Sequence, residues 1–126
     1  MKLILTDGSE TFRVWLKIKH YGNGNLAIVL YYMNGGILDI WTVVTVNLAL
    51  LICDENCAYI DVNNNGKEIL TWLVQNKLAT PTKRIDRYGY CIYPMYQFDP
   101  EALKSCDPEG YAEYIKYWRQ CNVCDE

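Results

Sequence analysis

Residues 11–20, TFRVWLKIKH, decide the fold, because apolar and polar side chains alternate along them. The apolar positions are Phe12, Val14, Leu16 and Ile18. Successive side chains of a β-strand point to opposite faces, so this alternation predicts a strand with one buried face. The opposite face is expected to carry Arg13, Trp15, Lys17 and Lys19.

The segments around this strand predict an antiparallel sheet. Residues 3–6, LILT, precede it across Asp7-Gly8-Ser9-Glu10, a turn signal that predicts a hairpin. The chain continues with LAIVLYYM at 26–33 and with ILDIWTVVTVNL at 37–48, a β-branched segment that we expect to bend near its middle. AYIDV at 58–62 predicts a further short strand.

Helix signals begin after residue 62. Asn65 is the expected N-cap of a helix that reaches residue 78, with Glu68 three positions later in capping-box spacing. Residues 79–89, ATPTKRIDRYG, predict a loop. Residues 90–98, YCIYPMYQF, predict a strand, in which Pro94 indicates an edge or a bulge.

Two more helices are expected near the end of the chain. Asp99-Pro100-Glu101 and Asp107-Pro108-Glu109 each combine an N-cap, a first-turn proline and an acidic residue. The apolar stripe of the last helix is Tyr111, Tyr114, Ile115 and Trp118. The sequence therefore predicts one α+β domain over residues 1–126, an antiparallel sheet from the N-terminal half with helices from the second half packed on it.

Charge is unevenly distributed in this chain of net charge −3. From Asp99 onward acidic residues exceed basic ones by four, so the first 98 residues carry +1. The acidic region from Asp99 to Glu113 is either a solvated surface or a surface for a basic protein partner, with Tyr117 as an aromatic anchor. An acidic chain lacks the basic footprint of nucleic-acid binders, and direct nucleic-acid binding is not expected.

A cytoplasmic location is expected, with no membrane segment. The start, MKLILTDG, is too short in apolar residues for a secretory signal. The longest apolar run, residues 37–53, contains Asp39 and Asn47 and predicts strands instead of a span. Disulfides seldom persist in the cytosol, so the six cysteines need another explanation.

Four cysteines are spaced as two chelating pairs, Cys53-x3-Cys57 and Cys121-x2-Cys124. Two such pairs from distant segments predict a structural zinc site that would fasten the C-terminus, with Cys121 directly after the last helix. Free thiols and a redox-active pair are the alternatives, and the redox hypothesis is weak because the second pair follows a helix instead of opening one. Cys106 is a substitute ligand, whereas Cys91 fits a strand position.

Catalytic patterns are not found in the sequence, and we predict no enzyme and no catalytic residue. His20, the single histidine, is expected to be a half-exposed turn residue. A tetrathiolate zinc has no open position at which to activate water. The basic cluster of Lys83, Arg84 and Arg87, with tyrosines nearby, could contact RNA or single-stranded DNA. Three cations are few compared with the basic charge that nucleic-acid-binding proteins usually carry.

Several short blocks occur in an order that resembles a known family. They are Leu26 to Leu30, Thr45 to Leu48, Ala58 to Asn64, Pro81-Thr82 and Gly89 to Pro94. Together they are similar to small uncharacterised proteins carried by phages and conjugative elements of gut bacteria. The four paired cysteines and the last helix depart from that pattern.

The resemblance implies a mobile-element accessory protein and provides no catalytic residues to transfer. Small acidic proteins of such elements often disarm host defence, and a zinc-bearing member looks like the type II anti-CRISPR proteins that inhibit Cas9. The expected partner is therefore a host defence nuclease such as Cas9. A zinc-stabilised module with another protein partner and a weak RNA- or single-stranded-DNA-binding regulator are the alternatives.

Overall fold

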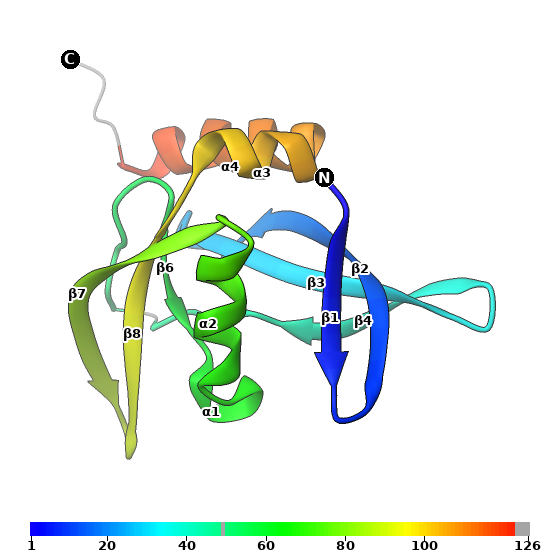
Figure 1. Ribbon diagram of the computed structural model, residues 1–126. Coiled ribbons are helices and arrows are strands. Elements are labelled where there is room, and N and C mark those ends of the chain that lie inside the picture. The colour runs from blue at the N-terminus through cyan, green and yellow to red at the C-terminus, as the bar shows by residue number, and fades with distance from the viewer. Residues whose placement is uncertain (49, 123–126) are drawn as a thin grey trace.

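The computed structural model describes residues 1–48 and 50–122, and these form two antiparallel sheets and four helices (Figure 1). The first sheet is a meander of β1 (Leu3–Asp7), β2 (Glu10–His20), β3 (Leu26–Asn34) and β4 (Ile37–Val43), paired in that order. Its inner face buries Val14, Leu16 and Ile18, which confirms the predicted strand and its faces.

The second sheet has the order β5-β6-β8-β7. Its strands are β5 (Thr45–Val46), β6 (Cys57–Ile60), β7 (Ala79–Tyr88) and β8 (Cys91–Phe98). The α+β class and the antiparallel pairing are confirmed, but the strands form two sheets where the sequence predicted one.

Val44 connects the two sheets. Its N–H donates to the carbonyl of Ile28 on β3 (2.9 Å), and its own carbonyl accepts from the N–H of Asp61 (2.8 Å). The Thr45 hydroxyl accepts from the Ile28 N–H at 3.1 Å. The predicted bend in residues 37–48 is thus confirmed as the point where the chain leaves the first sheet for the second.

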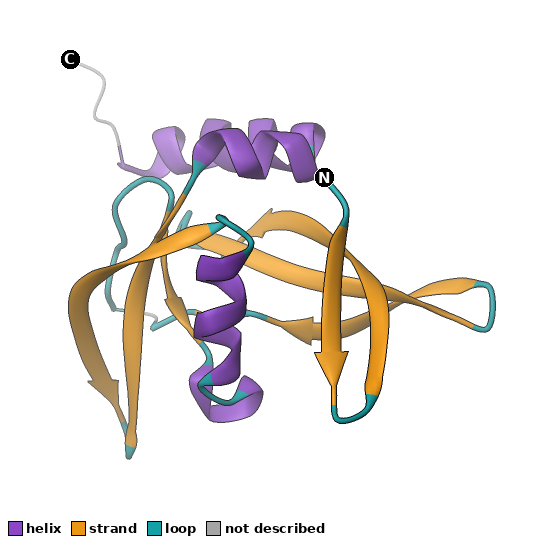
Figure 2. Ribbon diagram, in the orientation of Figure 1, coloured by secondary structure: helices purple, strands orange, loops and turns teal. Residues whose placement is uncertain are grey.

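The helices are α1 (Val62–Asn65), α2 (Glu68–Gln75), α3 (Pro100–Cys106) and α4 (Pro108–Asn122). Figure 2 shows α3 and α4 across the top of the molecule and α2 between the two sheets. No helix in the described part of the chain is long and apolar enough to cross a membrane.

The caps of α3 and α4 are confirmed, whereas the cap predicted at Asn65 is wrong. The Asp99 carboxylate accepts from the N–H of Glu101, and that of Asp107 accepts from the N–H of Gly110 at 3.1 Å. Lys67 occupies the N-cap position of α2 and makes no side-chain cap bond, whereas Asp61 caps the separate helix α1 by accepting from the N–H of Asn64. Asn65 is the last residue of α1, and its side-chain amide donates to the carbonyls of Val43 and Asp61.

Residues 79–88 form strand β7, and the predicted loop is wrong. Pairing with β8 breaks between Pro81 and Ile85, where Lys83 has a φ of +72°. Tertiary pairing with β8 therefore overrides a local sequence that reads as a turn. The predicted strand at 90–98 is confirmed, with Pro94 opposite Ile85 at the end of this irregularity.

Two buried clusters stabilise the fold. The larger one joins the inner faces of both sheets to α2, α3 and α4, and includes the fully buried Ile28, Leu73 and Tyr114. The smaller one covers the other face of the second sheet, where Tyr59 and Met95 pack under Leu48 and Cys53 of the connection between β5 and β6.

Candidate functional site

Cys53 and Cys57 bracket the connection that leads into β6, and both side chains are buried. The buried amide of Asn25 organises this connection, because it accepts from the Cys53 N–H and donates to the Leu51 carbonyl, both at 2.9 Å. Burial, and to a smaller extent the neighbouring Cys57, raise the pKa of the Cys53 thiol from 9.0 to about 11. In the metal-free protein both groups are therefore neutral thiols within the smaller core cluster.

Helix α4 is fastened onto this connection by side chains. The Trp118 indole N–H donates to the Cys53 carbonyl (3.1 Å), and the Arg119 guanidinium pairs with Glu55 (3.2 Å). One and two turns earlier, the Tyr114 hydroxyl accepts from the Asn56 N–H at 2.8 Å, and the Tyr111 hydroxyl donates to the Asn56 side chain at 2.7 Å. Aromatic and ionic contacts thus attach the last helix to the segment that contains Cys53 and Cys57.

Cys121 lies inside α4 and not after it, so its predicted position is wrong. It is exposed, and its Cβ lies near Gly24 of the β2–β3 turn, where a φ of +90° and the close approach both favour glycine. Cys124 lies outside the described residues. Within residues 1–48 and 50–122 no group of three or more histidines, cysteines or carboxylates is arranged to hold a metal ion. Zinc stays a prediction.

The two other cysteines belong to separate places. Cys106 ends α3, and its Sγ lies 3.9 Å from the sulfur of Met1. Cys91 begins β8 and packs against the smaller cluster, which confirms the predicted strand position. The five described cysteines, Cys106 and Cys91 included, are free thiols.

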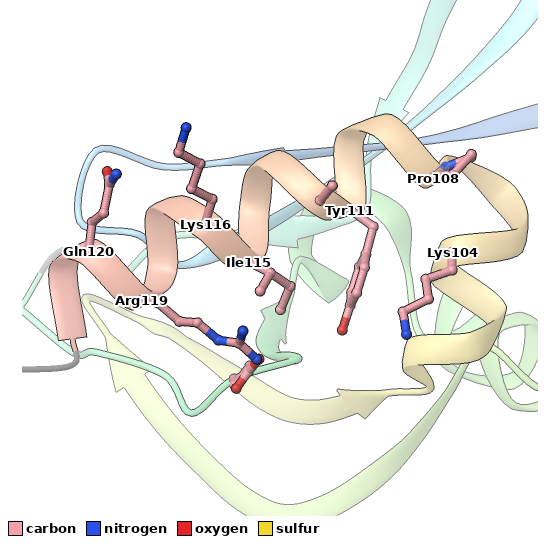
Figure 3. A pocket seen from close by; sticks show the side chains of 9 residues that line it. Lys104, Pro108, Tyr111, Ile115, Lys116, Arg119 and Gln120 are labelled. Atoms are coloured by element: carbon pink, nitrogen blue, oxygen red, sulfur yellow. The ribbon is translucent and has the colours of Figure 1, made fainter.

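A groove of about 970 Å³ lies along α4 beside Glu55 (Figure 3). Tyr111 and Ile115 provide its apolar surface, and Lys104, Lys116 and Arg119 provide its charge. Its only carboxylate among the lining residues, Glu55, is held by Arg119. This lining offers apolar packing and cationic contacts to a ligand.

The acidic region from Asp99 to Glu113 is partly used by the fold. Asp107 accepts from Gly110 and from the Ile18 N–H of β2 at 3.0 Å, and Asp99 caps α3. Tyr117 is not a free anchor either, because its ring stacks on His20 with centroids 4.1 Å apart and its hydroxyl donates to the Gly22 carbonyl. Besides the cap residue Asp99, the exposed acids of this region are Glu101, Glu109 and Glu113.

His20 is the last residue of β2 and is exposed, close to its predicted place at a strand end. Its Nδ1 lies 3.3 Å from the Tyr21 carbonyl, and the stacked Tyr117 ring is its other neighbour. No acidic or nucleophilic side chain of the described residues bonds to it, so the geometry gives it no catalytic partner.

The basic cluster lies on strand β7. The Arg84 guanidinium pairs with Asp86 at 3.0 Å, and the same carboxylate accepts from the buried Tyr59 hydroxyl. Together these two donors lower the pKa of Asp86, because both favour its charged form. Lys83 and Arg87 are exposed.

The end of the β7–β8 hairpin exposes large apolar side chains, a feature that sequence reasoning missed. The exposed fractions are 62% for Ile85, 62% for Tyr88, 103% for Tyr90 and 47% for Ile92. The hairpin extends away from α3 and α4 to the lower left of Figure 1. The sequence predicted a loop over residues 79–89 and a strand over residues 90–98, and only the three-dimensional arrangement shows that nothing in the described chain covers Ile85 and Ile92.

Comparison with known proteins gives a family but no characterised relative. Neither a curated protein nor a solved structure matches the chain. A family model does match over residues 15–118, which run from β2 to the third turn of α4. The chain therefore belongs to the family described as "Domain of unknown function (DUF4313)".

Proposed function

We propose that this chain is a protein-binding module that acts without catalysis and docks through its β7–β8 hairpin. The observation that carries the proposal is the exposure of Ile85, Tyr88, Tyr90 and Ile92 at one end of one hairpin. Ile85 and Ile92 share one face of the hairpin, since Ile92 pairs with Arg87 two residues from Ile85, and soluble proteins rarely expose neighbouring large apolar side chains unless a partner covers them. Tyrosine and arginine are also the residues that most often anchor protein interfaces, and Arg87 lies directly opposite Ile92.

The position of β7 supports the same surface. β7 is an edge strand of the second sheet, so its outer N–H and C=O groups can pair with a strand of a partner. Lys83 and Arg84 lie near the irregularity of this edge, and such charges hinder unspecific pairing between copies. The hairpin end beyond Ile85 is thus the part that is both apolar and regularly paired.

The finer form of the proposal is that the partner is a host defence nuclease such as Cas9 and that binding inhibits it. This form rests on the resemblance to mobile-element proteins and on the acidic surface, since Cas9 is strongly basic around its nucleic-acid channel. The proposed location is the host cytoplasm, where that nuclease works. A zinc-stabilised module with another protein partner is the alternative form, with Cys53, Cys57, Cys121 and Cys124 as its proposed ligands.

A pull-down against Cas9, with and without guide RNA, tests the identity of the partner. Retention of Cas9 together with loss of DNA cleavage is expected for an inhibitor. Failure to retain either form of Cas9 would contradict the finer proposal, and the same hairpin variants would then be applied to proteins captured from the host.

Variants of the hairpin test the docking surface. We expect Tyr90→Ser and Ile92→Ser each to weaken partner binding by about 30-fold, because truncation of an anchor residue costs about 2 kcal/mol or more. Ile37→Ser is a matched control, since Ile37 is 71% exposed on the β3–β4 hairpin of the other sheet. Equal affinity of the hairpin variants and the wild type, with unfolding unchanged, would remove this surface from the proposal.

A further inference from the structure

The outer face of the first sheet is a second surface, with its own composition. The register places Trp15 of β2 directly opposite Tyr31 of β3, on the face away from the buried Val14 and Leu16. On the same face, Met33 pairs with Leu38 and Tyr31 pairs with Ile40, and both aliphatic partners on β4 are exposed. None of these outward residues belongs to either core cluster.

Three cations share this face, and aromatic rings position two of them. The Arg13 guanidinium lies over the Trp15 ring at 4.6 Å from its centroid. The Lys19 ammonium lies 5.7 Å from the Tyr31 ring centroid and donates to the Tyr31 hydroxyl at 3.1 Å. Lys17 lies between them on β2. None of the three takes part in an ion pair within the described residues.

Carboxylates are kept away from this face. Asp39 on β4 pairs with Tyr32 and so has the register of the inner face, while Asp7 and Glu10 pair with each other beside the hairpin turn. A chain of net charge −3 therefore carries a sheet surface of charge +3 in its described residues. The positive charge of this face is complementary to an anion. The net negative charge of the chain would instead indicate a cationic partner.

We propose that this face binds a single-stranded nucleic acid, with bases stacked on the Trp15–Tyr31 pair and phosphates contacted by Arg13, Lys17 and Lys19. Two rings side by side on adjacent strands offer stacking to two unpaired bases, which every base can use. An arginine plane over one ring extends the stack, since bases also stack on guanidinium groups. A duplex hides its base faces, so single strands fit this surface better. The inference is independent of the protein partner proposed above and uses a different sheet.

The test is fluorescence anisotropy of a fluorescein-labelled oligo(dT) or oligo(U) of about 15 nucleotides, titrated with the full chain at several salt concentrations. Three phosphate contacts predict a slope of log K against log salt of about −2, from about −0.7 per contact on a single strand. Trp15→Leu and Tyr31→Leu are each expected to weaken binding by about 5-fold to about 150-fold, the loss of one stacked base. Tyr31→Phe keeps the ring and should bind within about twofold of the wild type.

Two triple variants separate local from overall charge. Arg13→Gln with Lys17→Gln and Lys19→Gln should remove the salt dependence. The control replaces three exposed cations of other surfaces with glutamine and changes net charge equally: Lys67, Lys77 and Lys116. We expect the control to keep both affinity and slope. An equal loss in the two triple variants would overturn the assignment to this face.

Two further results would overturn the proposal. One is duplex DNA binding as tightly as the single strand, because stacking would then contribute nothing. The other is a polyglutamate peptide that binds as tightly and is indifferent to Trp15→Leu, which would assign the face to an acidic protein. Every variant is first checked by urea unfolding, and the Tyr31→Phe and Tyr31→Leu pair decides the stacking role if Trp15→Leu fails to fold.

Discussion

Replacement of Asp107 by alanine should destabilise the fold more than any other change to an acidic residue of the helical layer. The Asp107 carboxylate caps α4 through the Gly110 N–H (3.1 Å) and also accepts from the Ile18 N–H of β2 (3.0 Å). Loss of an N-cap costs about 1 kcal/mol. A backbone donor left without a partner at a half-buried site costs about 1–3 kcal/mol more. The free energy of unfolding should therefore fall by about 2–4 kcal/mol.

The matched control is Asp99→Ala, which removes the cap of α3. Its carboxylate accepts from the N–H of Glu101 at 3.4 Å and makes no hydrogen bond to a strand of the described residues, so the expected loss is about 1 kcal/mol or less. Both variants are compared by urea unfolding, followed by tryptophan fluorescence and far-UV circular dichroism with the m-value monitored. If Asp107→Ala loses no more stability than Asp99→Ala, the carboxylate does not join α4 to β2 as we argue.

Three further predictions address the metal, the α4 contacts and the acidic surface. Purified protein should carry about one equivalent of zinc with all-sulfur ligands, detected by native mass spectrometry and lost in Cys121→Ser; an unchanged melting temperature after chelation would contradict a structural metal. Tyr114→Phe leaves the Asn56 N–H without its acceptor and should cost about 1–3 kcal/mol in urea unfolding. Burial raises the pKa of Tyr114, so the folded state keeps a proton that the unfolded state loses above about pH 10. The free energy of unfolding should therefore fall as the pH rises past that point, and it should fall less steeply in the Tyr114→Phe variant. Reversal of the exposed acids Glu101, Glu109 and Glu113 to lysine should slow association with a basic partner and reduce its salt dependence, whereas unchanged binding by surface plasmon resonance would identify these acids as merely solvated.

The first sheet was predictable because the sequence signals that define it come from neighbouring residues. Alternation along β2 defines a buried face without reference to any other strand, and a glycine turn fixes its pairing with β1. The acidic residue followed by proline at Asp99 and at Asp107 likewise marks two helix starts from neighbouring residues alone. These elements were correct because local preference and tertiary packing agree.

The second sheet was less predictable because its strands depend on partners outside their own local sequence. Strand β7 contains Pro81 and a left-handed residue at Lys83, and both favour a turn when taken alone. The strand exists because β8 supplies partners on both sides of the irregularity, from Ala79 to Tyr88. The cap predicted at Asn65 failed for a related reason: residues 62–65 form a separate short helix that begins at Asp61 directly after β6, and α2 starts only after Lys67.

The internal partners of a charged residue are the best guide to whether it serves the fold or binds a ligand. Asp107 has the charge and position of a binding residue, yet two backbone donors occupy its carboxylate, and a variant there would report stability before it reported binding. Arg13 and Lys19 interact with aromatic side chains of their own sheet face, and neither forms an ion pair with a carboxylate of the described residues. A cation held over a ring keeps its charge available to an outside anion, because the ring neutralises none of it. Charges without an opposite charge inside the fold, rather than the net charge of a segment, therefore give the stronger evidence for a binding surface in this chain.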